Sequence, residues 1–341
     1  MSTAITVSIV IPIRNRASLF KTTVDSLRHQ TYPHWEAILV DDGSSTEQYQ
    51  RIAAIASADA RIHPIENRGP RSGACACRNL GLGAATGAYV IFLDSDDALA
   101  PDCLAQRLAA ITTAPEAGFV VFPSWYFQEV PGDSTALWNV FDGTDDIERL
   151  IAGDSPWQTS GPIWRRDALV KVGPWDERLR SWQDTEFHLR ALIIGVRYQK
   201  IAVPDSYWRS PGGESSIGAR SRSPEYVFNR ARMLGRIGVL LRDHGKMTRT
   251  RRQAMSLQFF RHAFQTRLPR RHALAIWRLG RQLRLVSHSE YWTGLFLDSL
   301  ERVARRASRR GLRQLYPAIE RPLRFGSEHY SAQSSPPSAR Q

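Results

Sequence analysis

Two acidic runs in the first hundred residues have the composition of a cation or nucleotide site. In the run Asp94-Ser95-Asp96-Asp97, one residue separates Asp94 from Asp96. At a strand-to-helix turn, two carboxylates at this spacing can direct oxygens at one divalent cation, and Mg²⁺ and Mn²⁺ prefer oxygen ligands and keep positions open for phosphate. Without a cation or a basic partner, such carboxylates repel one another. The run predicts a metal site at Asp94 and Asp96.

The second run, Asp41-Asp42-Gly43-Ser44, also follows an apolar segment. Either run alone has an ordinary structural explanation, because Asp-Gly-Ser sequences form turns and aspartates begin helices. Both runs fall where a predicted strand ends, and this shared position favours a common site.

The elements that must position these runs alternate between strand and helix patterns. Apolar runs predict strands at 6–11, 36–40, 61–65 and 89–93, and helical spacing predicts helices between them at 17–29, 46–57 and 73–85. This alternation is typical of an α/β fold with a parallel, doubly covered sheet. Ligands of such sheets bind beyond the carboxyl ends of the strands, where Pro12, Arg14 and Asn15 also lie.

Beyond residue 115 the alternation weakens. Strand patterns at 119–122, 124–130, 160–165 and 196–201, with helices at 144–151 and 183–194, predict a mixed extension of the sheet. Residues 212–223 are rich in glycine and serine and predict a mobile loop, whereas 224 to about 311 have a helical pattern throughout. We therefore expect a first domain at 1–220, a basic helical extension at 221–325 and a disordered tail at 326–341.

Composition and charge bound the class of protein. The chain has 341 residues, of which 42% are hydrophobic and 23% charged, as expected for a globular protein. No apolar run approaches the roughly 18–20 residues that cross a bilayer. Three cysteines form neither a paired disulfide framework nor a zinc pattern, and the N-terminus lacks secretory features, so we expect a cytoplasmic protein.

The charge is distributed unevenly along the chain. Residues 1–220 hold 21 Lys and Arg against 26 Asp and Glu, whereas residues 221–341 hold 25 against 7. A basic, amphipathic helical region is typical of proteins that lie on an anionic membrane surface. Arginine clusters also bind nucleic acid, but no recognition pattern is present, so we expect the inner face of the membrane as the partner and not nucleic acid.

Several short blocks have a characteristic order and spacing. They are Val7-Ser8-Ile9-Val10-Ile11-Pro12, Asn15, Gln30-Thr31-Tyr32, Val40-Asp41-Asp42-Gly43-Ser44, Arg78-Asn79-x-Gly81, Phe92-Leu93-Asp94-Ser95-Asp96-Asp97, Gly173-Pro174-Trp175-Asp176-Glu177 and Asp184-x-x-Phe187-x-x-Arg190. Together these blocks resemble the family 2 glycosyltransferases with the GT-A fold. The resemblance covers about residues 6–216 and implies a nucleotide-binding half of parallel β-α-β units followed by an acceptor half.

The resemblance also implies a reaction. An inverting transfer would move a sugar from a nucleotide diphosphate sugar to a saccharide or lipid-linked acceptor, in surface polysaccharide or glycolipid assembly, with Mn²⁺ or Mg²⁺ on the diphosphate. By position in the family pattern, the residues that bind the nucleotide sugar are Pro12, Arg14, Asn15, Asp42, Arg78, Asp94 and Ser95, and those that bind the metal are Asp94 and Asp96. The alternative hypothesis is a nucleic-acid-binding or scaffold protein with a transferase-like fold and no turnover.

An inverting reaction needs a general base that takes the proton of the acceptor hydroxyl. Asp184 matches the aspartate of the family's acidic pair at the start of a helix, although Gln183 replaces the acidic residue before it. Trp182 beside it and Arg209 are candidate acceptor contacts. Pro211 stands where family members often carry a histidine that reaches the metal, which removes that ligand.

Overall fold

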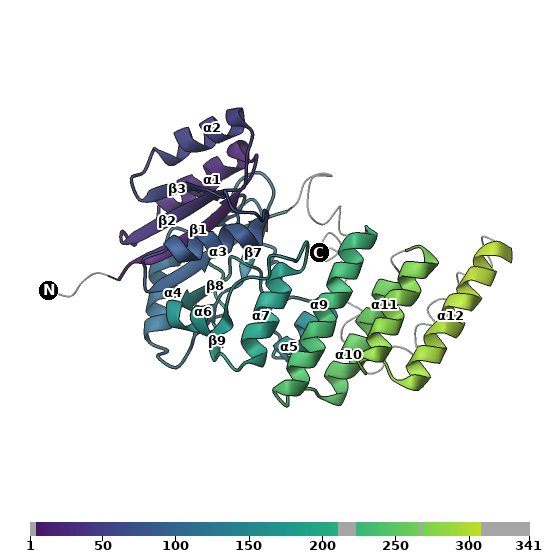
Figure 1. Cartoon of the computed structure of the whole chain (residues 1–341). Helices are drawn as coiled ribbons and strands as arrows, with labels where there is room; N and C mark the ends of the chain where they lie inside the picture. The colour runs from purple at the N-terminus through teal and green to yellow at the C-terminus, as the bar shows by residue number, and fades with distance from the viewer. Residues whose placement is uncertain (1–4, 211–222, 266–267, 308–341) are drawn as a thin grey trace. The chain divides into compact units, whose positions relative to one another are not determined.

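The computed structural model describes residues 5–210, 223–265 and 268–307, and the chain forms two compact units (Figure 1). The first comprises the residues up to Asp146 and Ser155–Ser216, and the second comprises Ile147–Asp154 and the residues from Ile217 onward. The predicted tail at 326–341, and all but the last residue of the predicted loop at 212–223, lie outside the described residues. None of the described helices is long and apolar enough to cross a bilayer.

A seven-stranded sheet forms the centre of the first unit, in the order β3-β2-β1-β4-β8-β6-β9. Its strands are β1 (Val7–Ile13), β2 (Trp35–Asp41), β3 (Ile62–Glu66), β4 (Tyr89–Phe92), β6 (Phe119–Val121), β8 (Pro162–Arg165) and β9 (Tyr198–Lys200). β3, β2, β1 and β4 are parallel, whereas β8 is antiparallel to β4 and β6. The predicted parallel half and mixed extension are confirmed.

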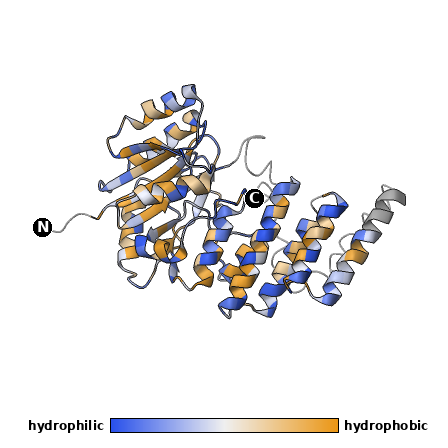
Figure 2. Cartoon of the chain, viewed as in Figure 1, coloured by the Kyte–Doolittle hydropathy of each residue, from blue (hydrophilic) through white to orange (hydrophobic). Residues whose placement is uncertain are grey.

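Helices cover both faces of this sheet. They are α1 (Ala17–Arg28), α2 (Thr46–Ala56), α3 (Ala74–Ala84), α4 (Cys103–Thr112), α6 (Arg166–Val172) and α7 (Gln183–Ile193). Alternate residues of a strand point to opposite faces, so Leu39 joins the core beneath α1 and α2, while Ile38 and Val40 pack with Cys77 of α3. Figure 2 shows hydrophobic residues concentrated on the central strands.

The approach of α3 to the sheet depends on Gly81. A Cβ at this position would lie 2.4 Å from Cγ1 of Val10 on β1 and 3.1 Å from Cγ2 of Val40 on β2. Since no real Cβ makes the first contact, any larger residue would move the helix away from the strands. Glycine here therefore sets the depth at which α3, which carries Arg78, lies on the sheet.

The first unit also contains a second sheet of three strands, in the order β5 (Ala98–Leu99), β10 (Ser206–Arg209), β7 (Ser124–Phe127). The strand predicted at 124–130 ends three residues early, because the carboxylate of Asp133 accepts backbone N–H groups of residues 128–130 and turns the chain. The sequence patterns did not predict α4, α6, β5 or β10.

The second unit is helical. α9 (Pro224–Asp243), α10 (Arg249–Phe260), a short π-helix (Arg261–Gln265), α11 (Arg270–Gln282) and α12 (His288–Ala307) follow one another, and α5 (Asp146–Ala152) contributes Ile147–Ala152. Ser223 caps α9 by accepting from the N–H of Tyr226, and Pro224 occupies the first turn. The predicted continuous helical region is thus four α-helices within the described residues.

Candidate functional site

The carboxyl ends of β2, β1 and β4 lie side by side. β1 is the middle strand, with Ile13 opposite Asp41 on β2 and Val10 opposite Phe92 on β4. Because the three strands are parallel, the loops that follow them meet at one edge of the sheet. The structure thereby brings together three predicted groups, namely Pro12 to Asn15, the run at 41–44 and the run at 94–97.

Asn15 joins the loop after β1 to the loop after β2. Its φ of 52° is a left-handed conformation that asparagine tolerates better than most residues. Its Oδ1 accepts from the backbone N–H of Ser45 at 2.8 Å, and its own N–H donates to Oγ of Ser44 at 2.9 Å. These bonds give Asn15 a structural role at the edge of the site, and its contact with a nucleotide stays a prediction.

Asp41 and Asp42, at the end of β2, have different hydrogen-bond partners. Asp41 closes the turn by accepting from the backbone N–H groups of Gly43 and Ser44. Asp42 accepts from Nδ2 of Asn67 at 2.9 Å and from the N–H of Gly73 at 2.8 Å, and Nη1 of Arg14 lies 3.7 Å from its Oδ2. Asp42 is therefore the member of the pair that lines an open edge of the sheet.

The three aspartates after β4 have three different partners. Oδ1 of Asp94 accepts from Nη2 of Arg78 at 2.7 Å, and Asp96 forms an ion pair with Arg16. Asp97 is buried and accepts from Oγ of Ser160 at 2.9 Å and from the N–H of Arg209 at 3.1 Å. Asp94 and Asp96 thus lie at the surface of the site, whereas Asp97 holds the loop from beneath. Ser95 between them is buried, and its carbonyl accepts from Thr23.

Burial and mutual repulsion perturb these carboxyl groups. Burial raises the pKa of Asp96, and the charge of Asp94 adds to the increase while Arg16 opposes it. Burial, together with the charges of Asp96 and Asp94, raises the pKa of Asp97 well above its ordinary value. A cluster of this kind stabilises a cation placed between its members.

The donor set of Asp94 and Asp96 fits a hard divalent cation, since it offers only carboxylate oxygens and leaves room for phosphate ligands. Each carboxylate is at present balanced by an arginine. In the described part of the chain, no group of three or more His, Cys, Asp or Glu side chains is placed to hold a metal. Metal binding at this pair accordingly remains a prediction.

Arg78 connects the acidic run to the start of α7. Its side chain is 5% exposed, and its guanidinium carbon lies 4.6 Å from the centroid of the Trp175 ring, which in turn stacks on Phe187 of α7. Nη1 of Arg78 makes a long 3.5 Å contact with Oε1 of Gln183. The Nε atom of Arg78 is buried without a hydrogen-bond partner.

Asp184 lies in the first turn of α7 and faces the same charges. Burial raises its pKa, the N–H of Thr185 and the charge of Arg78 oppose the increase, and the charge of Asp94 adds to it. A carboxylate with a raised pKa is a better proton acceptor near neutral pH than an ordinary aspartate. The structure therefore brings the predicted base into electrostatic contact with Arg78 and Asp94, about 90–106 residues away in sequence.

The two predicted acceptor contacts differ in environment. Trp182 precedes α7 with a φ of 58°, a strained conformation for a bulky side chain, and such strain is concentrated at functional sites. The guanidinium of Arg209 donates from Nη1 to the carbonyl of Gln128 at 2.7 Å and from Nε to that of Asp96 at 3.1 Å. Arg209 thus ties β10 to the acidic run, and its contact with an acceptor stays a prediction.

Sequence patterns missed two participants in this site. Arg16 directly follows the predicted residues of the β1 loop, and this position next to Asn15 was the one available signal. Gln183 was noted only as a departure from the family pattern, although its amide contacts Arg78 and also donates to the carbonyl of Leu179 at 3.0 Å.

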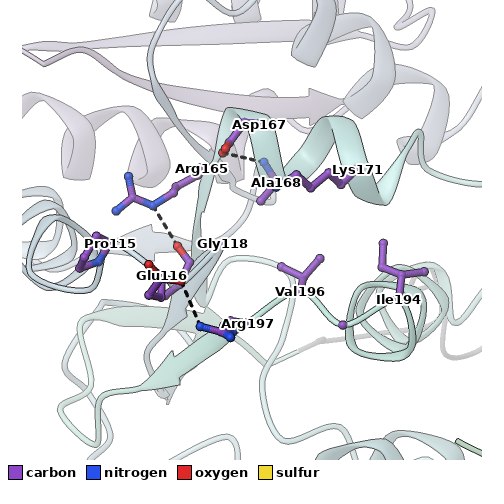
Figure 3. A pocket seen from close by; sticks show the side chains of 12 residues that line it. Pro115, Glu116, Gly118, Arg165, Asp167, Ala168, Lys171, Ile194, Val196 and Arg197 are labelled. Carbon is purple, nitrogen blue, oxygen red and sulfur yellow. Dashed lines mark hydrogen bonds and ion pairs between the residues drawn. The ribbon is translucent and has the colours of Figure 1, made fainter. Parts of the chain in front are cut away.

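A separate hollow of about 350 Å³ lies elsewhere on the first unit (Figure 3). Arg165, one of its lining residues, pairs with Tyr89 at the beginning of β4, so the hollow is at the sheet edge opposite the acidic runs. Glu116 and Arg197 form an ion pair across it at 3.0 Å. None of the predicted site residues lines it.

Known proteins resemble this chain in sequence. The family model of Glycosyl transferase family 2 matches residues 8–172. The amylovoran biosynthesis glycosyltransferase AmsB of Erwinia amylovora is 31% identical over 209 residues, which are 59% of this chain and 68% of AmsB. The minor teichoic acid biosynthesis protein GgaA of Bacillus subtilis is 27% identical over 224 residues, 63% of this chain but only 49% of GgaA.

Solved structures share the fold at lower identity. The structure of S. aureus TarS 1-349 in complex with UDP-GlcNAc aligns with a TM-score of 0.64 at 19% identity, covering 84% of this chain and 82% of that chain. The mannosyltransferase PcManGT of Pyrobaculum calidifontis, in complex with GDP-Man and Mn²⁺, aligns with a TM-score of 0.51 at 17% identity, covering 94% of this chain and 84% of that chain.

Proposed function

The chain belongs to glycosyl transferase family 2 and has the GT-A fold, and we propose that its site moves a sugar, with inversion, from a nucleotide diphosphate sugar to a saccharide or lipid-linked acceptor. The observation that carries the proposal is the convergence of Asp94, Arg78 and Asp184, which come from three separate segments and share one electrostatic environment. The relatives named for amylovoran and teichoic acid biosynthesis support an acceptor in surface polysaccharide assembly.

On the donor side, Asp42 and the loop residues Pro12, Arg14 and Asn15 would hold the nucleoside, and Ser95 would lie beneath the ribose. Arg78 and Arg16 are the cations nearest to Asp94 and Asp96, so both are placed to receive the negative charge of a diphosphate. Asp94 and Asp96 would hold Mg²⁺ or Mn²⁺, which when bound would stabilise the charge on the leaving diphosphate. The Mn²⁺ in the PcManGT complex supports this choice of cation.

On the acceptor side, Asp184 would take the proton from the attacking hydroxyl. The burial that raises its pKa suits it to this role, and the charge of Arg78 opposes that increase. Trp182, the N-cap residue of α7, would stack its ring on an acceptor sugar. Arg209 would fix the loop that carries Asp96.

The basic helices would hold the enzyme on anionic lipid. Residues 221–341 carry 25 Lys and Arg against 7 Asp and Glu, and each basic residue near an anionic surface contributes about 1 kcal/mol. Docking of this kind would place the enzyme at the inner membrane face, where a lipid-linked acceptor is presented. The expected partner is an anionic bilayer, and preferential binding to RNA at physiological salt would contradict it.

A panel of nucleotide sugars tests the proposed activity. We expect one or two of them to raise the thermal stability of the protein in the presence of Mn²⁺ and to release a nucleoside diphosphate, because a bound ligand stabilises the folded state. Asp184→Asn should keep the thermal shift and lose the release. Absence of both responses for every common donor would contradict the proposed function.

A further inference from the structure

We propose that Trp292 and Phe296 of α12 insert into the headgroup region of an anionic bilayer and anchor the helical unit there. The inference rests on the proposed membrane docking and names the side chains that convert electrostatic attraction into insertion.

Trp292 and Phe296 are unusually exposed for their size. Trp292 is 58% exposed and Phe296 is 62% exposed, and no other Trp or Phe in the described part of the chain is among the exposed large hydrophobic residues. The two residues are four apart on a helix, so their side chains lie one above the other on the same face. His288 continues this face by one turn, and Nε1 of Trp292 donates to its Nε2 at 3.3 Å.

The opposite face of α12 is fixed within the helical unit, so the direction of the aromatic pair is set. Glu290 is buried, pairs with Arg252 at 2.8 Å and accepts from the N–H of Ser287 at 2.7 Å. A Cβ at Gly294 would lie 2.6 Å from the ring of Trp277, and Nε1 of Trp277 donates to the carbonyl of Tyr291 at 3.0 Å. The helix therefore cannot rotate to bury Trp292 and Phe296 without losing these contacts.

The exposed charge of the helical unit is mostly basic, which favours an anionic occupant. Among the described residues of 223–299, two acidic side chains are exposed, Glu225 and Asp243. Eight arginines are exposed in the same range: Arg232, Arg236, Arg242, Arg249, Arg270, Arg271, Arg278 and Arg284. A helical unit that exposes many arginines and also presents Trp and Phe has the chemistry of a protein that lies in the bilayer interface, where the amphipathic indole ring is most stable.

Partition of the full-length protein between buffer and vesicles tests the inference. Vesicles of phosphatidylglycerol mixed with phosphatidylcholine are compared with vesicles of phosphatidylcholine alone. We expect the double variant Trp292→Ala, Phe296→Ala to bind the anionic vesicles about tenfold or more weakly, because each aromatic side chain buries apolar area on insertion. Val170→Ala is the matched control, since Val170 is 76% exposed on α6 of the first unit, and it should bind as the native protein does.

A second substitution separates insertion from a change in folding. Trp292→Phe keeps an apolar ring, so it should bind the vesicles nearly as well as the native protein but show less quenching of tryptophan fluorescence by lipids brominated near the headgroup. If the double variant binds like the native protein, or if native and Trp292→Phe proteins are quenched equally, the insertion is wrong and any docking is purely electrostatic.

Two further measurements separate membrane insertion from self-association and from catalysis. A double variant that loses self-association in sedimentation velocity without losing vesicle binding would assign the face to a second copy of the chain and overturn the proposal. Release of nucleoside diphosphate from a soluble donor is measured separately and without vesicles, so loss of transfer activity and loss of membrane insertion are read independently.

Discussion

Nη2 of Arg78 lies 2.7 Å from Oδ1 of Asp94, and this ion pair forms one end of a stack in which the guanidinium covers the Trp175 ring. The stack continues through Phe187 into α7, the helix that begins beside Asp184. One buried arginine therefore contacts both the acidic run after β4 and Gln183 in the first turn of α7.

Asp96→Ala should abolish metal-dependent nucleotide binding while the fold is retained, because half of the proposed oxygen donor set is removed. Calorimetric titration of nucleoside diphosphate with and without Mn²⁺ measures the effect. Asp25→Ala removes a carboxylate that pairs with Lys21 on the surface of α1, so it serves as the control and should bind normally. Full metal-dependent binding by Asp96→Ala would remove Asp96 from the metal site.

Asp184→Asn should lower kcat by about 10²- to 10⁴-fold, the usual contribution of a general base, and should leave donor affinity nearly unchanged. In the native enzyme the acidic limb of kcat/KM should lie above the ordinary range of an aspartate, because burial raises the pKa of Asp184. Steady-state kinetics across pH measure both effects. An equal loss in donor affinity would instead give Asp184 a structural role.

Arg78→Met should move that acidic limb to higher pH. The positive charge of Arg78 lowers the pKa of Asp184, so its removal leaves only backbone N–H groups, that of Thr185 first, to oppose burial and the charge of Asp94. Donor affinity should fall as well, since the methionine cannot pair with Asp94 or phosphate. Arg78→Lys restores a positive charge without the planar guanidinium group. It should therefore return the acidic limb of kcat/KM close to its native pH but restore only part of the donor affinity. If the acidic limb of Arg78→Met lies at the native pH, the charge of Arg78 does not influence the pKa of Asp184.

Gly81→Ala should lower the free energy of unfolding by about 1–3 kcal/mol, because the added Cβ would meet Val10 at 2.4 Å. Gly83 lies on the same helix, and a Cβ there would meet nothing within 4 Å. Gly83→Ala should therefore be neutral or stabilising by about 0.5–1 kcal/mol, the gain from replacing an exposed helical glycine. Urea denaturation of both variants makes the comparison, and equal effects would mean that α3 does not depend on this close approach.

His188 should make the fold sensitive to acid. The ring is buried between Trp157 and Trp164, its Nδ1 has no hydrogen-bond partner, and burial lowers its pKa to about 3 from 6.5. The unfolded chain therefore binds a proton that the folded chain excludes, and stability should fall as pH decreases from 6.5 toward 3, by up to about 1.4 kcal/mol per pH unit.

Chemical denaturation of His188→Phe across this range should show a weaker pH dependence than the native protein. His63→Gln changes an exposed histidine on β3 and should follow the native curve. Parallel curves for His188→Phe and native protein would show that folding does not lower the pKa of His188.

Apolar runs predicted β1, β2 and β4, whereas a charged residue buried within an apolar face can hide a helix from the sequence pattern. α4 is an example, since Arg107 falls within its apolar face and breaks the pattern. In the structure Arg107 is fully buried and donates to both carboxylate oxygens of Asp205, at 2.6 and 2.7 Å. A pairing between residues 98 positions apart leaves no local signal, so the helix was not predicted.

The same limit applies to the site. Strand ends and the spacing of carboxylates located Asp42, Asp94 and Asp96, because parallel strands deliver their loops to one edge. The ion pair between Arg16 and Asp96 joins residues 80 positions apart and depends on where a long side chain reaches. Such contacts follow from the three-dimensional packing, which the order of residues along the chain does not reveal.

The segment Ile147–Asp154 belongs to the helical unit although it lies within the sequence of the first unit, which limits how the helical unit could be exchanged or removed. Its Leu150 and Ile151 are fully buried, and the side chain of Gln258 on α10 donates to the carbonyl of Ala152. Truncation of the chain near residue 216 would leave this segment without the helices that bury it. Its apolar side chains would then be exposed and would promote aggregation. An engineered graft of the helical unit onto a different transferase must therefore carry two separate segments of the chain, so this unit cannot be exchanged as a simple C-terminal appendage.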